Sequence, residues 1–497
     1  MPNIPLAIYQ VAQIRELERL AQKRFGIAAD VMMQRAGKAA LECLVRRWPH
    51  AKSIAVFCGK GNNGGDGYVL ARLAAERGLQ VTVWQVGGGG ALHGGAQQAF
   101  AACQQANVLL CTFNKSEQFA LVDVIVDAMC GIGLSGKVRG DVLQAIEMIE
   151  QAGIPILAID IPSGIDADNG QVLGKAIKAT QTITFIGLKL GLLTGRGVAY
   201  AGEVVCHSLQ LPAELFSQVL PIAEKTTIAY FGSCLAPRPR DWHKGQSGHV
   251  LIIGGDYGFQ GAPLLAAKAA LRVGAGLVSV ATRVEHARCL NVMTPEIMVH
   301  GVSAAKELTT LMDDADVIVL GPGLCRSAWS RECWEVAIHA KTPLVVDADG
   351  LNLLAEFPQT RADWVLTPHP GEAGRLLRKT SQDIQDDRLN ALFAMQKRYG
   401  GFCILKGAGS LILSPGKIPV LCDKGNPGMA TAGMGDMLSG VLGGLVAQGL
   451  PLVNAAPLGV YLHAIAGDLA AAGEERGLIA TDLLPYLRQL SNNPDHV

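Results

Sequence analysis

Short apolar runs alternate with amphipathic segments through the first half of the chain. Residues 11–25 and 68–78 carry apolar side chains at helical spacing with charges between them, which predicts helices. The apolar runs have the length and composition of strands: SIAVFCG (53–59), QVTVWQV (80–86), DVIVDAM (123–129), PILAIDIP (155–162) and QTITFIG (181–187). Strands that alternate with helices form a parallel sheet with helices on both faces, and such a sheet binds ligands at the loops after its strands.

The alternation breaks once, between residues 220 and 247, where three prolines and clustered charges indicate a connection between domains. It restarts with the runs HVLIIGG (249–255), LVSVAT (277–282), DVIVLGPG (316–323), PLVVDADG (343–350), DWVLTPHP (363–370) and FCILKGAG (402–409). We therefore place a boundary near residue 225. The sequence predicts two three-layer α/β domains, residues 1–224 and 225–497.

Composition narrows the possible partners. The chain has 43 basic and 43 acidic residues and no basic stripe, which argues against nucleic acid as a partner. Its 12 cysteines include no CxxC pair, so free thiols in a reducing compartment are expected. We expect a cytoplasmic protein without membrane contact, because no signal peptide or long uncharged apolar run is found. We also expect a homo-oligomer, with Ile14 and Leu17 as exposed interface positions.

The first glycine-rich loop, GKGNNGGDG (59–67), satisfies the dinucleotide-binding pattern GxGxxG with Gly59, Gly61 and Gly64. A dehydrogenase would need an acidic residue about 20 positions later, and Gln85 ends the next strand instead. The loop is not a Walker loop either, because no Gly-Lys-Ser/Thr closes it. A lone GxGxxG without its acidic partner is weak support for a dehydrogenase.

Three loops of the first domain share an oxygen-rich composition. The first contains Asn62, Asn63 and Asp66; the second, DAMCGIGLSGKVRG (127–140), begins with Asp127; the third, AIDIPSGIDADNG (158–170), contains Asp160 and Ser163. Each follows a predicted strand, so we expect one shared site rather than three unrelated turns. Amide groups there suit a phosphate, and carbonyl and side-chain oxygens suit a cation.

These three motifs resemble the YjeF N-terminal family of NAD(P)H-hydrate epimerases over roughly residues 10–220, which implies a Rossmann-like domain. The family interconverts the R and S forms of hydrated NADH and NADPH (NADHX and NADPHX). The resemblance implies that Asn63, Asp127 and Ser163 contact K⁺ and that Asp160 is catalytic. The substrate-facing residues it implies are Asn62, Asn63, Gly64, Gly65, Asp66, Gly131, Ile132, Gly133, Leu134, Ser135, Gly136, Lys137 and Asp160. Some eukaryotic relatives carry a lysine at the position of Ser135.

The second domain carries a further series of loops at predicted strand ends. GGDYGFQGA (254–262) exposes amides before a helix and suits a substrate phosphate. Asp347 and Asp349 end one strand, and His369 and Glu372 lie near a helix start. We expect His369 to contact a ligand and Glu372 either to act on Mg²⁺ through water or to stabilise its helix.

The last two loops have the composition of a phosphate site. Lys406 begins KGAGS (406–410), and NPGMATAGMGD (426–436) ends on Asp436 just before an apolar helix. Glycines let the backbone approach an anion, and the helix N-terminus favours negative charge. An N-cap is the ordinary role for such an Asp. The surrounding glycines and the upstream KGAGS favour catalysis.

This arrangement resembles the ribokinase-like fold and, more closely, the YjeF C-terminal family of ADP-dependent NAD(P)H-hydrate dehydratases over about residues 228–490. The resemblance implies ADP and Mg²⁺ at this site, with Asp436 as the base. It further implies nucleotide contacts at Lys406, Gly407, Ala408, Gly409, Ser410 and Gly435, and substrate contacts at Ala262, Gly323, His369 and Asp436.

The implied function is repair of hydrated NADH and NADPH: epimerisation of both forms and ADP-dependent dehydration of the S form, giving NAD(P)H, AMP and phosphate. Two alternatives stay open at this point. An ATP-dependent kinase of a vitamin precursor shares the second fold but leaves the first domain unexplained. A non-enzymatic nucleotide sensor would not need Asp436.

Overall fold

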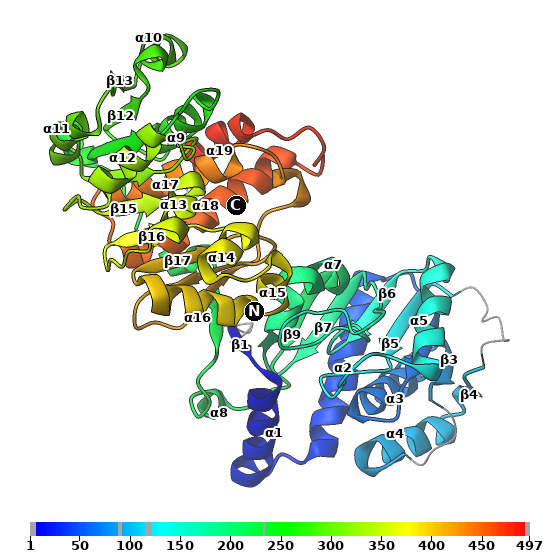
Figure 1. Cartoon of the computed structure of the whole chain (residues 1–497). Helices are drawn as coiled ribbons and strands as arrows, with labels where there is room; N and C mark the ends of the chain where they lie inside the picture. Colours follow the sequence, from blue (N-terminus) through cyan, green and yellow to red (C-terminus); the bar gives the residue numbers. More distant parts are fainter. Residues whose placement is uncertain (1–5, 88–91, 115–121, 232–233, 493–497) are drawn as a thin grey trace. The chain divides into compact units, whose positions relative to one another are not determined.

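The computed structural model describes residues 6–87, 92–114, 122–231 and 234–492. The chain forms two compact units, residues 1–224 and 225–497 (Figure 1). Each unit is a layered α/β structure, as the alternating pattern predicts. Among the described residues, no helix has the length and apolar character needed to cross a membrane.

The sheet of the first unit has seven strands in the order β4-β3-β2-β5-β6-β7-β9, and neighbouring strands are parallel. The strands are β2 (Ser53–Cys58), β3 (Gln80–Gln85), β4 (Leu109–Thr112), β5 (Val124–Ala128), β6 (Ile156–Ile159), β7 (Gln181–Phe185) and β9 (Glu203–His207). The central strands β5 and β6 are buried along their whole length, which explains their unbroken apolar sequences.

Helices cover both faces of this sheet. They are α1 (Val11–Phe25), α2 (Ala29–Arg47), α3 (Asn62–Glu76), α4 (Gly94–Gln105) and α5 (Gly140–Ala152). Successive strand residues point to opposite faces, so Val56 belongs to the core beneath α2 and α3, whereas Phe57 belongs to the core beneath α5. Ile14 and Leu17 are 2% and 0% exposed. The expectation that they lie exposed is wrong, because this face of α1 packs into the first core.

The second unit has the strand order β13-β12-β11-β14-β15-β16-β17-β18-β19. The strands are β11 (His249–Ile253), β12 (Leu277–Thr282), β13 (Met298–Gly301), β14 (Val317–Leu320), β15 (Leu344–Val346), β16 (Trp364–Leu366), β17 (Phe402–Leu405), β18 (Ser410–Leu413) and β19 (Val420–Cys422). Pairing is parallel from β13 to β17, and β17–β18–β19 is an antiparallel meander. The KGAGS loop is therefore the turn of the β17–β18 hairpin.

The helices of this unit include α9 (Gly261–Arg272), α10 (Val284–Met293), α12 (Ala328–Ala337), α13 (Ala348–Glu356), α14 (Pro370–Leu377), α16 (Arg388–Tyr399), α17 (Met434–Ala447), α18 (Leu452–Ala471) and α19 (Leu483–Leu490). Figure 1 shows α17 and α18 in orange and red beside the strands of this unit. Helices α9 and α17 approach closely at Gly440, where the lack of a side chain leaves room for the Ala266 carbonyl oxygen. A Cβ on Gly440 would collide with that oxygen. The glycines of α17 thus serve packing within the core.

Candidate active sites

The oxygen-rich loops of the first unit converge at one edge of its sheet. Gly59 follows β2 and lies so close to the next loop that a Cβ there would collide with the Met129 carbonyl oxygen. Gly131 is also close to the first loop, since a Cβ on it would lie 3.1 Å from Asn63 Cβ. Parallel strands end at a common edge, which is why loops distant in sequence come together here.

Two of the predicted cation ligands, Asp127 and Ser163, form a buried polar cluster, and the third, Asn63, is buried beside the neighbouring Gly131. Ser163 donates from Oγ to Asp127 Oδ1 at 2.6 Å and from its amide to Asp127 Oδ2 at 2.8 Å. The Cys130 amide donates to Ser163 Oγ at 2.9 Å. Burial raises the pKa of Asp127 to about 6, and the Ser163 bonds act in the opposite direction. The side-chain oxygen and nitrogen of Asn63 are buried without a hydrogen-bond partner among the described residues.

Asp160, the predicted catalytic residue, follows β6 with a left-handed backbone, φ 66°. Its Oδ1 accepts a hydrogen bond from Lys189 Nζ at 2.6 Å. Lys189 ends β8 (Leu188–Lys189) and is 1% exposed, and its ammonium also donates to Thr184 Oγ1 and the Phe185 carbonyl, each at 2.8 Å. With these acceptors the buried cation is fully paired and holds the Asp160 carboxylate in place.

A cavity of about 810 Å³ opens at this sheet edge. Of the predicted substrate residues, its wall includes Asn62, Asn63, Asp66, Gly131, Ile132, Gly133, Leu134, Ser135 and Asp160. Gly64, Gly65, Gly136 and Lys137 are not on this wall. Helix α1 contributes Arg15 and Glu18, and α2 contributes Met32 and Met33. The cavity therefore joins two of the predicted loops and Asp160 to helices on which sequence reasoning placed no site residue.

In the second unit, Lys406 and Asp347 form the centre of the polar site. Lys406 Nζ lies 2.6 Å from Asp347 Oδ1, and Ser439 Oγ donates to Asp347 Oδ2 at 2.6 Å. Burial opposes the charge of Lys406, yet the Asp347 carboxylate holds the pKa of that ammonium above its ordinary value. Burial likewise opposes the charge of Asp347, and Lys406 keeps the pKa of that carboxyl low. The ion pair is therefore charged in the folded protein.

Asp436 lies in the first turn of α17, beside this pair. A Cβ on the preceding Gly435 would lie 3.3 Å from both Asp347 Oδ2 and Lys406 Nζ, which places the helix start directly over the ion pair. Burial, then repulsion from Asp347, raises the pKa of Asp436 to about 7, and Lys406 opposes that rise. A carboxyl that titrates near neutral pH is suited to accept a proton.

His369 and Glu372 cap α14. The Gly371 amide donates to His369 Nδ1 at 3.0 Å, and the His369 amide donates to Glu372 Oε2 at 2.8 Å. Glu372 thus stabilises its helix, one of its two expected roles, and it also lies 3.9 Å from Lys406 Nζ. Burial raises the pKa of Glu372 to about 7. The His369 side chain is 51% exposed and so accessible to a ligand.

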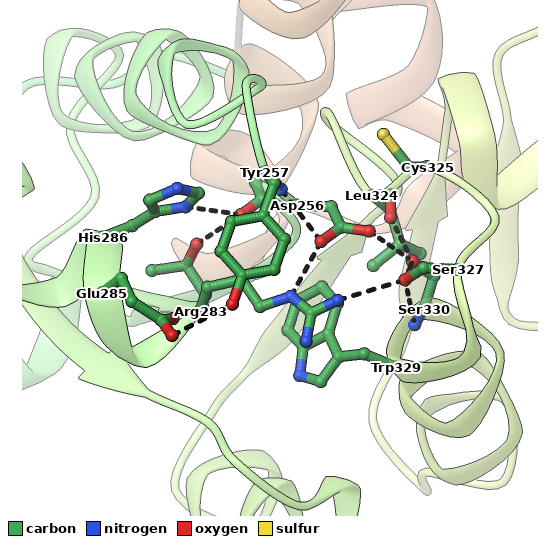
Figure 2. A network of polar contacts seen from close by, with 12 residues as sticks. Asp256, Tyr257, Arg283, Glu285, His286, Leu324, Cys325, Ser327, Trp329 and Ser330 are labelled. Atoms are coloured by element: carbon green, nitrogen blue, oxygen red, sulfur yellow. Dashed lines mark hydrogen bonds and ion pairs between the residues drawn. The ribbon is translucent and has the colours of Figure 1, made fainter.

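The structure brings Ala262 and Gly323 together, since a Cβ on Gly323 would lie 3.1 Å from Ala262 Cβ. The loop before Ala262 is fixed by an ion pair between Arg283 Nε and Asp256 Oδ1 at 2.7 Å. Figure 2 shows the Arg283 guanidinium between the Tyr257 and Trp329 rings, 4.6 and 4.5 Å from their centroids. Aromatic and charged contacts therefore hold this loop against β12 and α12.

Sequence reasoning missed three residues that order the two sites: Lys189, Arg388 and Ser439. Lys189 is a lone cation in the apolar run FIGLKLGLL (185–193), a signal that the sequence did contain. Arg388 is buried, and its Nη2 donates to the carbonyls of Leu405, Lys406 and Gly409, which shapes the KGAGS turn. No signal in the sequence pairs Arg388 or Ser439 with their distant partners.

The family described as YjeF-related protein N-terminus matches residues 29–191, and the family described as NAD(P)H-hydrate dehydratase matches residues 250–489. The bifunctional NAD(P)H-hydrate repair enzyme Nnr of Coxiella burnetii is 50% identical over 98% of this chain and 99% of its own length. The Escherichia coli protein of that name is 40% identical over 99% of this chain and 95% of its own length.

A solved ribokinase-like superfamily protein from Enterococcus faecalis is 29% identical, with a TM-score of 0.51 over 55% of this chain and 96% of its own length. The likeness confirms the predicted fold of the second unit. The full-length matches favour repair over the two alternatives, because the matched proteins are named as repair enzymes. The matches also include the first unit, which a vitamin-precursor kinase leaves unexplained. The chain belongs to the family of bifunctional NAD(P)H-hydrate repair enzymes.

Proposed function

We propose that the first unit epimerises hydrated NADH and NADPH and that the second unit dehydrates the S form with ADP. The observation that carries the assignment is that each unit holds its own carboxyl–lysine centre, Asp160 with Lys189 in one and Asp436 beside Lys406 in the other. The two family matches fall within separate units, residues 29–191 and 250–489. Epimerisation supplies the stereoisomer that a chiral dehydratase site accepts.

In the first unit, Asp160 handles the proton of the substrate hydroxyl. Its carboxylate lies on the cavity wall, and the paired Lys189 ammonium fixes its orientation. The glycine-rich loop at the start of α3 presents amides that suit the pyrophosphate of a dinucleotide. The cavity, at about 810 Å³, is within the ordinary range of sites for small molecules and cofactors.

The buried cluster of the first unit fits K⁺. Asn63 has a buried side-chain oxygen without a partner, and Asp127 contributes a negative charge that no basic side chain among the described residues pairs. Oxygen donors of this kind, with Ser163 Oγ, are the ligands that a hard cation takes. K⁺ held by these residues would supply positive charge near the amide-rich loops. Asn63, Asp127 and Ser163 are the residues that we assign to it.

In the second unit, Asp436 accepts the proton of the substrate hydroxyl as the oxygen attacks the terminal phosphorus of ADP. This step converts a poor leaving group into a phosphate ester and releases AMP. Loss of phosphate from the carbon, together with loss of a proton from the neighbouring ring carbon, then forms the ring double bond of NAD(P)H. We assign Lys406 and the amides of Gly407 to Ser410 and of Gly435 to the nucleotide phosphates, where Lys406 would supply a point charge.

Mg²⁺ fits this site only together with the nucleotide. No group of three or more His, Cys, Asp or Glu side chains is arranged as a metal site in the described ranges. Mg²⁺ retains several waters and takes phosphate oxygens as ligands, so it does not require a cage of protein side chains. Glu372 is the carboxylate that we assign to its water shell. Bound Mg²⁺ neutralises phosphate charge.

The test uses purified protein with K⁺, Mg²⁺ and both NADPHX epimers, followed by recovery of the reduced-nicotinamide absorbance with ADP, with ATP and without nucleotide. Full recovery with ADP supports both activities. Recovery that stops when the S form is consumed contradicts the epimerase assignment. Asp436→Asn is expected to lower dehydration by about 10³-fold while R and S forms still interconvert, since a base contributes on the order of 10²–10⁴-fold.

The remaining proposals concern the setting of the enzyme. We propose that it works in the cytoplasm as a homo-oligomer and binds neither nucleic acid nor membrane. The balanced charge of the chain supports the absence of nucleic-acid binding. Light scattering of the purified protein tests the oligomer, and a monomeric mass would contradict it.

A further inference from the structure

The cavity of the first unit contains a carboxyl group that the proposed chemistry has not used. Asp66 lies on the cavity wall together with Asp160, and it belongs to the first turns of α3. Helix α2 packs closely against its backbone, since a Cβ on Gly37 would lie 2.9 Å from the Asp66 carbonyl oxygen. The side chain is thus presented to the cavity from a helix that is packed against its neighbour.

Asp66 and Asp160 occupy different electrostatic environments. Asp160 has an ammonium partner at 2.6 Å, whereas no described residue forms a hydrogen bond or ion pair with the Asp66 carboxyl. Burial, followed by the charges of Asp160 and Glu18, raises the pKa of Asp66 well above its ordinary value, and Lys189 opposes the rise only in part. Two carboxyls that share one cavity but differ in their charged partners are a known basis for paired acid and base roles.

We propose that Asp66 is the proton donor that works with Asp160 in epimerisation; the proposal rests on the assignment of that activity to the first unit. The hydroxylated carbon of the hydrate is bonded to the ring nitrogen. Asp160 takes the hydroxyl proton, the oxygen electrons form a carbonyl, and the carbon–nitrogen bond breaks. The ring nitrogen takes the proton of Asp66. Closure on the other face of the carbonyl returns both protons and inverts the carbon.

Other groups facing the cavity are weaker candidates for the donor. Ser135 has a hydroxyl, which is a far weaker acid than a carboxyl. Arg15 of α1 faces the cavity as a permanent cation. Glu18 of α1 is the rival carboxyl, and burial and Asp160 also raise its pKa. Asp66 differs from Glu18 because it lies on the same helix, α3, as Asn62 and Asn63, which also line the cavity.

The experiment follows conversion of purified R-NADPHX to the S form by chromatography, without nucleotide, in the full-length protein and its Asp66→Asn and Glu18→Gln variants. We expect Asp66→Asn to lower kcat by about 10²-fold, with KM changed less than about 3-fold. The alkaline limb of the wild-type pH profile should vanish in this variant, because the wild-type rate falls as the donor deprotonates. We expect Glu18→Gln to lose less than about 3-fold.

Dehydration of pure S-NADPHX with ADP provides the folding control, since Asp66→Asn should leave it at the wild-type rate. A full epimerisation rate in Asp66→Asn, a loss confined to KM, or a larger loss in Glu18→Gln would each overturn the proposal. A wild-type protein that converts no R form would instead overturn the epimerase assignment itself. If Asp66→Asn does not fold, carbon-13 titration of the wild type decides, because Asp66 must titrate above the exposed Asp carboxyls of the same spectrum.

Discussion

Lys406 and Asp347 in the second unit repeat the 2.6 Å lysine–carboxylate contact of the first unit, with the burial reversed. In the first unit the Lys189 side chain is 1% exposed and its Asp160 partner 13%. In the second, the Asp347 side chain is 2% exposed and Lys406 18%. In the first unit, the buried Lys189 therefore holds the more exposed Asp160 carboxylate in place. In the second unit, the buried Asp347 holds the more exposed Lys406 ammonium in place. The first suits proton transfer, and the second suits phosphate binding.

Replacing Asp347 with Asn should weaken nucleotide use. The Lys406 ammonium would lose its charged partner in a buried position, and breaking such a pair costs about 3–5 kcal/mol. We expect a rise of about 10-fold in KM for ADP and a fall in dehydration of about 10²-fold, measured by steady-state kinetics on S-NADPHX. Asp363→Asn is the matched control, because the Asp363 side chain is 45% exposed and pairs with Arg361. Equal losses in both variants would contradict the role of Asp347.

Asp436→Asn should make the second unit more stable, and more so at alkaline pH. Burial raises the pKa of Asp436 to about 7, so folding favours the protonated acid. Stability is therefore lost as pH rises from the unfolded-state pKa through about 7, and Asn does not titrate. With a discount for partial exposure, we expect a gain of about 1–2 kcal/mol at pH 8. Calorimetric melting at pH 5.5 and 8 measures it, and a larger gain at pH 5.5 would contradict this reasoning.

Lys189→Met should impair epimerisation and spare dehydration. Three acceptors would lose their donor, and Asp160 would lose the charge that orients it. We expect an epimerisation rate lower by about 10²-fold and a loss of about 2–4 kcal/mol in stability. Lys175→Met is the control, since its ion pair with Glu150 is 3.0 Å long but has exposed fractions of 39% and 33%. That variant should cost at most about 1 kcal/mol.

Ser163→Ala should raise the K⁺ concentration that the first unit requires. The hydroxyl orients Asp127 at 2.6 Å and is itself a proposed ligand. Loss of a supporting ligand contact typically weakens cation affinity by about 10–100-fold. Epimerisation and thermal melting, both titrated with KCl at constant ionic strength, measure the shift. Ser217→Ala, at an exposed position, is the control, and an unchanged K⁺ dependence in Ser163→Ala would remove Ser163 from the site.

Much of this organisation could be predicted because parallel α/β folds place their chemistry at strand ends. The runs before Gly59, Asp127 and Asp160 are apolar and short, and their loops necessarily meet at one sheet edge. The same logic places Asp347 and Lys406, which follow β15 and β17, at one edge of the second sheet. Periodicity sufficed for these residues because strand direction alone determines which end of the sheet they occupy.

Contacts set by tertiary packing could not be predicted in this way. The amphipathic pattern of α1 gave an apolar face, and only the packing of that face against the first core shows that Ile14 is buried and that Glu18 lines the cavity. Arg388 reads as an ordinary charged residue at a helix start, yet it is 3% exposed beneath the KGAGS turn. Such pairings depend on side chains far apart in sequence, and local pattern carries no information about them.

The close contact of α17 with α9 has a mechanical consequence. Gly440 of α17 touches the backbone of Ala266, one turn from Ala262 on α9, while Asp436 lies one turn before Gly440. The helix that presents the base and the helix that begins at the substrate loop are thus packed backbone to backbone. A methyl group added at Gly440, in the core and one turn from Asp436, should push α17 away from α9 and displace the base relative to its substrate, so the turnover rate depends on how closely these two helices pack.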